Sequence, residues 1–203
     1  MNYFLLIEHD HISKFEIENL MPFTDSWCEK LADLTRKKES LLARCLVNKL
    51  CKKLELGSIH ECGFKKDSKG RPYLSNHPNL FLSITHCQGF VFVTASNSPV
   101  GIDFEKIDPI SSEDLKIAFN DLDWKIVSAD INSMFKYFSL KESYSKMTGT
   151  GFTREPAEIQ LVDIEKNSYY SFFEINGLRY VFTIITLHIE PKKFLNLQFN
   201  FST

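Results

Sequence analysis

Helix-like and strand-like segments follow one another in the same order in both halves of this chain, and that order most constrains the fold. In the first half, residues 25–56 place leucines at helical spacing, whereas residues 81–86 and 89–96 have the alternation and the β-branched and aromatic content of strands. In the second half, residues 111–128 and 132–147 again have helical spacing. The remaining strand predictions are residues 3–7, 59–66, 158–164, 169–175, 180–187 and 195–201.

The pattern in each half therefore predicts helices followed by an antiparallel meander. Two such halves correspond to an α+β fold of two similar α/β lobes. The seam between the lobes is expected near residues 105–112, so the N-terminal lobe would span residues 1–107 and the C-terminal lobe residues 108–203. A chain of 203 residues suits two small packed lobes, and its 18 Phe and 7 Tyr supply an adequate core.

Charge and cysteine content limit the partners and the compartment. The formal net charge of -2 excludes a nucleic-acid-binding polycation, so an anionic ligand would need a local basic patch. The apolar run near the N-terminus lacks a basic flank and is predicted as a strand, and no run approaches the ~20 residues of a membrane span. An odd number of cysteines without CxxC spacing indicates reduced thiols in a soluble, cytoplasmic protein. They are Cys28, Cys45, Cys51, Cys62 and Cys87.

The first candidate for chemistry is the strand-like segment VGIDFE, residues 100–105. On a strand, Asp103 and Glu105 face the same side, and two carboxylates this close repel each other unless a cation sits between them. Oxygen ligands of this kind favour Mg²⁺ or Mn²⁺. The alternative is a solvated edge strand that carries two acids, which is the usual state of such a pair taken alone.

A second candidate lies on the helix predicted over residues 132–147. Phe138, Glu142 and Lys146 are spaced four residues apart and share one helical face. Glu142 could act as a third metal ligand or a general base, and Lys146 could neutralise a phosphate. The alternative is an ordinary surface Glu–Lys pair, worth only ~0.3–0.5 kcal/mol.

A third candidate combines a turn with a strand end. Arg71 lies between Gly70 and Pro72 in a polar turn, which places a guanidinium beside a rigid bend. His86 ends a predicted strand, where an imidazole could hydrogen-bond a phosphate. The alternative is that His86 has only a structural role, which is the more common role of a lone histidine.

Taken in order, four segments resemble the 4′-phosphopantetheinyl transferases. They are GRP, ITHCQGFVFVTAS, VGIDFEKI and FSLKESYSKMTGTG, within residues 70–152. The similarity is to the longer, surfactin-synthetase-activating type, in which one chain forms a pseudo-dimer. The resemblance implies two lobes in a pseudo-twofold arrangement, an active site in the cleft between them, and a monomer.

The resemblance implies a metal role for several carboxylates. Asp103 and Glu105 match the family's metal-binding Asp and Glu, and Glu142 matches its metal-linked general base. Asp123 lies where many members have a further metal-side acid, usually Glu; because Asp is shorter, a water bridge would serve there. The expected ion is Mg²⁺, with Mn²⁺ as an alternative.

Other positions match residues that hold coenzyme A. Lys146 corresponds to a lysine that contacts its phosphate, and Lys141 to the lysine before the catalytic Glu. Arg71 lies where the family has a basic residue beside the adenosine 3′-phosphate. Thr85 and His86 match a Ser-His pair that touches the 3′-phosphate and the diphosphate.

The chain departs from the family pattern at three further positions. Cys87 replaces a serine, and Phe138 replaces the usual tryptophan. Glu39 occupies the place of an N-terminal arginine, which leaves open whether Lys37, Lys38 or Arg44 grips the nucleotide.

The implied function is transfer of 4′-phosphopantetheine from coenzyme A to a serine of an apo acyl or peptidyl carrier protein, with release of 3′,5′-ADP. Secondary-metabolite carriers fit the longer family type, and no nucleic acid or membrane partner is expected. Three alternatives remain. They are a different Mg²⁺-dependent phosphoryl or nucleotidyl enzyme, a catalytically inactive relative that binds coenzyme A or a carrier, and a structural domain without a site.

Overall fold

The chain forms two antiparallel β-sheets. A computed structural model describes residues 5–24, 26–109, 114–150 and 156–188. The first sheet contains β1 (Leu5–His11), β2 (Phe64–Lys66), β3 (Pro72–Leu74), β4 (Phe81–Cys87) and β5 (Phe90–Ser96), in the order β1-β5-β4-β3-β2. The second contains β6 (Val100–Lys106), β7 (Ser168–Ile175) and β8 (Leu178–Thr186), in the order β6-β8-β7.

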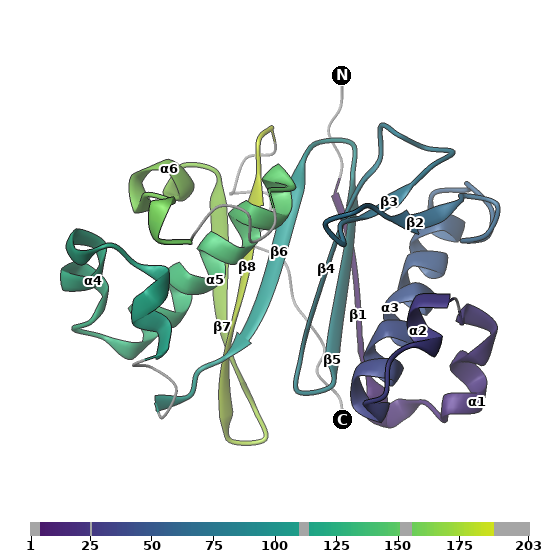
Figure 1. Ribbon diagram of the computed structural model, residues 1–203, viewed down its shortest axis with the longest axis horizontal. Coiled ribbons are helices and arrows are strands. Elements are labelled where there is room, and N and C mark those ends of the chain that lie inside the picture. Colours follow the sequence, from purple (N-terminus) through teal and green to yellow (C-terminus); the bar gives the residue numbers. More distant parts are fainter. Residues whose placement is uncertain (1–4, 25, 110–113, 151–155, 189–203) are drawn as a thin grey trace.

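Helices flank the two sheets on both sides. They are α1 (Ile17–Leu20), α2 (Ser26–Glu29), α3 (Leu34–Lys53), α4 (Asp121–Val127), α5 (Ile131–Thr148) and α6 (Leu161–Glu165). Short 3₁₀ turns occur at Ile12–Lys14, Met21–Phe23, Asp114–Ala118 and Pro156–Glu158. The sheets lie in the middle of the molecule, with α1–α3 on one side and α4–α6 on the other (Figure 1). No helix in the described ranges is both long and apolar enough to cross a membrane.

The two long helices have clear sequence boundaries. The Asp33 carboxylate accepts a hydrogen bond from the Arg36 amide and begins α3. The Asp130 carboxylate accepts from Asn132 and Ser133 at the start of α5. Gly149, with φ of 69°, ends α5 in the left-handed conformation.

Most of the predicted elements are confirmed, and the mixture of helices with antiparallel strands is as expected. The helix predicted over residues 132–147 is α5, and the hairpin of residues 81–96 is β4 and β5. The prediction over 59–66 is right only for the three residues of β2. The strand predicted over 195–201 lies outside the described residues.

Three predictions need correction. Residues 25–56 are not one helix, because α2 ends at Glu29 and α3 begins only after the Asp33 cap. Residues 111–128 divide into a 3₁₀ turn and α4, which begins at the cap residue Asn120; residues 111–113 lie outside the described chain. Residues 158–164 form a 3₁₀ turn and α6 rather than a strand. Leu161 and Ile164 are three residues apart, so one side of a helix can place both in the core beside α5.

Aromatic side chains join the two sheets face to face. The ring of Phe92 on β5 lies with its centroid 4.6 Å from that of Phe104 on β6 and 5.3 Å from that of Phe182 on β8. All three side chains are fully buried. The opposite face of the first sheet packs on α3, and α5 packs on β6 and β8. Each sheet therefore lies between a helix and the other sheet.

Polar contacts also connect the sheets, between β4 and β6. The Ile102 amide donates a hydrogen bond to Ser83 Oγ at 3.1 Å, and Thr85 Oγ1 donates to Asp103 Oδ1 at 3.0 Å. These contacts hold the carboxylate segment of β6 beside β4.

Helix α5 approaches β6 closely at Gly101. A Cβ atom at this position would lie 1.8 Å from the carbonyl oxygen of Ser143 and 2.6 Å from the amide nitrogen of Met147. Both of these are backbone atoms, so a side chain there would push the whole helix off the strand.

We expect Gly101→Ala to lower the free energy of unfolding by about 3 kcal/mol, because the added methyl group overpacks the helix–strand contact. Gly177→Ala is the matched control. Gly177 has φ of 75° but open space around it, so alanine there should cost only about 1 kcal/mol. Denaturant unfolding of both variants measures the difference, and equal losses would contradict the packing argument.

Candidate active site

Asp103 of β6 lies at the centre of a group of charged side chains. Its Oδ1 atom is 2.7 Å from Lys146 Nζ on α5 and accepts the hydrogen bond from Thr85. The residue is only 3% exposed. Its Oδ2 atom is buried and has no hydrogen-bond partner among the described residues. One oxygen of this carboxylate is therefore satisfied, and the other is available to a ligand.

Two further carboxylates share the electrostatic environment of Asp103. Burial and the Asp103 charge raise the pKa of Glu105 to about 8, and Glu142 adds to this rise while Lys146 opposes it. Burial and Asp103 also raise the pKa of Glu142. The two strand acids and the helix acid that the sequence singled out are therefore close enough for their charges to interact.

The carboxylates of Asp103, Glu105 and Glu142 suit a hard cation by their chemistry. Among the described residues, no three His, Cys, Asp or Glu side chains lie at the geometry of a metal site. The donors are all carboxylate oxygens, which Mg²⁺ and Mn²⁺ prefer. The unpartnered Oδ2 of Asp103 is the direct structural sign, because a buried carboxylate oxygen without a partner is costly. The raised pKa values of Glu105 and Glu142 point the same way, since a cation would relieve their repulsion.

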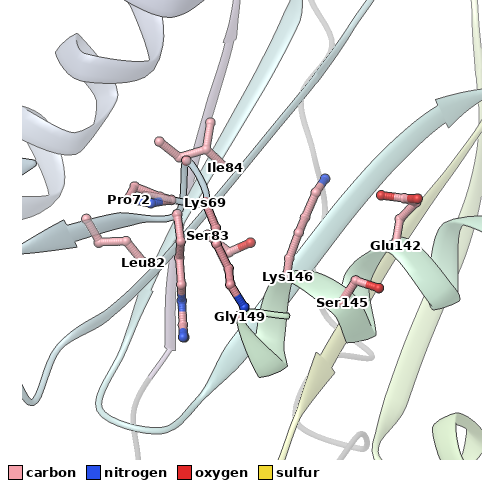
Figure 2. Close-up of a pocket in the computed structure, with 11 residues that line it drawn as sticks. Lys69, Pro72, Leu82, Ser83, Ile84, Glu142, Ser145, Lys146 and Gly149 are labelled. Carbon is pink, nitrogen blue, oxygen red and sulfur yellow. The ribbon is translucent and has the colours of Figure 1, made fainter. Parts of the chain in front are cut away.

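A cavity of about 190 Å³ opens beside this group. One wall comes from β3, β4 and the turn before them, and the other from the C-terminal half of α5, where Glu142 and Lys146 project one turn apart (Figure 2). Arg71 closes one end, with Nη2 donating to the Met147 carbonyl oxygen at 3.3 Å. The predicted Arg71, Glu142 and Lys146 therefore line one cavity.

A second cavity, of about 360 Å³, adjoins the first and shares Gly70, Pro72 and Ile84 with it. It lies between α3 and the first sheet. Its lining is basic, with Arg36, Arg44, Lys66 and His86. Arg36 was not among the expected site residues.

Thr85 and His86 point to opposite faces of β4, as successive strand residues do. Thr85 bonds Asp103, whereas His86 faces α3 and the second cavity. The resemblance implied that both touch coenzyme A. In this structure, Thr85 directly contacts the carboxylate group, and only His86 lines the basic cavity.

Glu39 is a site residue whose contacts the sequence did not reveal. Its Oε2 lies 3.1 Å from His86 Nδ1, and its Oε1 accepts a hydrogen bond from the Gly89 amide at 3.0 Å. Burial alone would raise the pKa of Glu39, but His86 and the Gly89 amide hold it below its usual range. Only the unusual position of a glutamate, where the family has arginine, marked it in advance.

Lys141 and Asp123 form a separate, buried pair. Lys141 Nζ lies 3.2 Å from Asp123 Oδ2 and donates to the Ala118 carbonyl oxygen at 3.0 Å. Burial lowers the pKa of Lys141 and Asp123 opposes this. Within the described ranges, neither residue has a recorded contact with Asp103 or lines the two cavities. The structure does not bring these two predicted site residues to the carboxylate group.

The chain is similar in sequence to proteins of known activity. Residues 99–192 match the family model described as the 4′-phosphopantetheinyl transferase superfamily. The chain is 26% identical to the 4′-phosphopantetheinyl transferase psf-1 of Bacillus pumilus, over 71% of this chain and 66% of the relative. It is 34% identical to gsp of Aneurinibacillus migulanus over 43% and 38% of the two chains. Identity to Sfp of Bacillus subtilis (strain 168) is 26% over 70% and 67%. The match spans about two thirds or less of each of these relatives.

The raised pKa of Glu105 predicts a pH dependence of stability without divalent cations. Its native pKa of about 8 lies above the ~4.3 of an unfolded glutamate, so the folded chain holds the proton more tightly. Stability should therefore fall as pH rises from about 4.3 towards 8. With EDTA present, we expect Glu105→Gln to exceed wild type in free energy of unfolding at pH 8 and to approach it at pH 5. Glu18→Gln, at an exposed site, is the control, and a pH-independent difference for Glu105→Gln would contradict the assignment.

The Lys141–Asp123 pair predicts a stability defect. Lys141→Met leaves a buried carboxylate without its cation, so the free energy of unfolding should fall by about 3 kcal/mol. The double variant Lys141→Met/Asp123→Leu should recover part of this loss, because it removes both charges. Urea unfolding of the three proteins measures this, and an unchanged stability for Lys141→Met would point to a ligand-binding role instead.

Proposed function

We propose that this chain, a member of the 4′-phosphopantetheinyl transferase superfamily, transfers 4′-phosphopantetheine from coenzyme A to a serine of an apo acyl or peptidyl carrier protein. The second product is 3′,5′-ADP. The observation that carries this proposal is the buried Asp103 carboxylate, with one oxygen on Lys146 and the other without a partner among the described residues. Lys146 in turn lines the first cavity. The relatives named above bear the same activity in their names.

The proposal includes the arrangement of the chain as two lobes, residues 1–107 and 108–203, related by a pseudo-twofold axis. Strand β6 precedes this division in the sequence but pairs with β8, so the sheet of the second lobe includes it. Support comes from the strand orders. In each sheet, the last strand pairs with the strand just before it and also with the first strand, which precedes the long helix. This gives β6-β8-β7 in the second sheet and β1-β5-β4 in the first, where β3 and β2 extend the sheet beyond β4. The site would lie in the cleft between the lobes, since its residues come from β4 and the turn before β3 on one side and from β6 and α5 on the other. A monomer would suffice for such a site.

Asp103, Glu105 and Glu142 would hold the divalent cation, Mg²⁺ or Mn²⁺. When bound, this ion would neutralise charge on the diphosphate and polarise its oxygens. Lys146 pairs with Asp103 in this structure. With the cation and the substrate bound, Lys146 would neutralise a phosphate oxygen of the substrate. Asp123 is not included among the ligands, because it pairs with Lys141.

The basic second cavity would receive the phosphates of coenzyme A. Arg36, Arg44, Lys66 and His86 line it, so its charge suits the 3′-phosphate and the diphosphate. Arg71 stands beside the first cavity and would add a further positive charge. These residues position the substrate, and positioning together with charge stabilisation contributes most of the catalysis in phosphoryl transfer.

Glu142 would act as the general base. Burial and Asp103 raise its pKa, which brings a carboxylate closer to the range in which it can accept a proton efficiently near neutral pH. It would take the proton of the carrier serine, directly or through water, as the serine oxygen attacks the β-phosphorus. The new bond joins serine oxygen to phosphorus, and the bond from phosphorus to 3′,5′-ADP breaks.

A second candidate function is binding of coenzyme A or a carrier without turnover. The contact between Lys146 and Asp103 favours it, because an ammonium group already balances the central carboxylate. Binding of coenzyme A, measured by calorimetry, in a protein that yields no modified carrier would support this alternative.

The test of transfer is the mass of an apo carrier protein after incubation with the chain, coenzyme A and Mg²⁺. We expect a phosphopantetheine mass increase, and at least a roughly hundredfold slower reaction for Asp103→Asn, since a central charge-stabilising group is lost. Glu8→Gln is the matched control, because Glu8 also pairs with a lysine, Lys53, but on β1. Absence of the mass increase with carriers of the acyl and peptidyl kinds would overturn the proposed function.

A further inference from the structure

We infer that Glu39 is a positioning residue for coenzyme A: its buried carboxylate holds the His86 ring through Nδ1, so that Nε2 faces a phosphate in the second cavity. The inference rests on the proposed function. It concerns a glutamate where the family pattern has an arginine, so the family resemblance offers no role for it.

The geometry fixes which ring nitrogen is left for a ligand. Glu39 Oε2 lies 3.1 Å from His86 Nδ1, so Nδ1 carries a hydrogen and donates a hydrogen bond to the carboxylate. Nε2 is then the nitrogen that remains for the cavity that His86 lines. The Glu39 side chain is 8% exposed and that of His86 is 53% exposed, so the carboxylate lies behind the ring and the ring faces solvent.

The negative charge of Glu39 is compatible with phosphate binding because it lies behind His86. A carboxylate that faced the second cavity would repel phosphates, whereas one placed behind His86 accepts a hydrogen bond from Nδ1 and leaves the other ring nitrogen to the ligand. Glu39 itself stays ionised, because His86 and the Gly89 amide hold its pKa below the usual range against the effect of burial. The arrangement is that of a carboxylate orienting a histidine whose other nitrogen meets the ligand.

Glu39 could instead serve only to hold the hairpin between β4 and β5, through its hydrogen bond from Gly89. A double-mutant cycle separates the two roles, because a purely structural effect does not depend on the His86 side chain. The variants are Glu39→Gln, His86→Asn and the two combined. Gln keeps the shape and an acceptor for the Gly89 amide but loses the charge.

Affinity for 3′,5′-ADP, measured by isothermal titration calorimetry, is the main readout. We expect Glu39→Gln to bind about tenfold more weakly than wild type, as a lost charge-assisted hydrogen bond would cause. In the His86→Asn background, the same substitution should have no further effect. In the transferase assay, Glu39→Gln should raise KM for coenzyme A and leave kcat nearly unchanged. Glu8→Gln, which breaks an ion pair elsewhere on the same sheet, should bind like wild type.

Two results would overturn the inference while leaving the proposed function intact. One is equal affinity of Glu39→Gln and wild type. The other is a loss that persists in the His86→Asn background, which would assign Glu39 to the hairpin alone. A wild-type protein that does not bind 3′,5′-ADP would overturn the proposed function, and this inference with it.

Discussion

The contact between α5 and Gly101 of β6 determines where the candidate catalytic groups lie. Because position 101 has no side chain, the backbone of α5 rests directly on the strand at Ser143. Lys146 reaches Asp103 from the next turn of the helix, and Glu142 lies one turn earlier on the same face. A helix held further away would separate the acids of β6 from Glu142 of α5. Both the packing of α5 on β6 and the composition of the site therefore depend on Gly101.

The charges of the site are arranged in two zones of opposite sign. Three carboxylates share one buried region, and Lys146 is the cation that offsets them in the part of the chain that the structure describes. The adjoining second cavity is lined by basic side chains. A diphosphate together with a divalent cation carries both kinds of charge. The two zones therefore favour a phosphate substrate over an uncharged one.

Sequence periodicity predicted the elements that carry the site, and it could not predict the contacts between distant side chains. Helix α5 and the β4–β5 hairpin follow from strong helical and strand patterns. Motif order singled out Lys146 and Asp103, which are in contact in the structure, and Glu142, which lines a cavity with Lys146. The pairing of Glu39 with His86 depends on how α3 packs against the first sheet, which no local pattern records. The helix α6 was mistaken for a strand because short apolar runs fit both periods until the neighbouring core is known.

The two strand–helix units of the chain explain why one of them would bind a cation and the other would not. Glu8 and Asp10 are the fourth and sixth residues of β1, as Asp103 and Glu105 are of β6. Each fourth residue pairs with a lysine of the following long helix, Glu8 with Lys53 and Asp103 with Lys146.

The two units differ at the position one helical turn before the lysine that pairs with the strand acid. Helix α5 has Glu142 four residues before Lys146, whereas α3 has Lys49 four residues before Lys53. At these matched positions the first unit has two acids and two lysines, and its Asp10 also pairs with Lys14. At the corresponding positions the second unit has three acids and one lysine, and a divalent cation would neutralise this excess of negative charge.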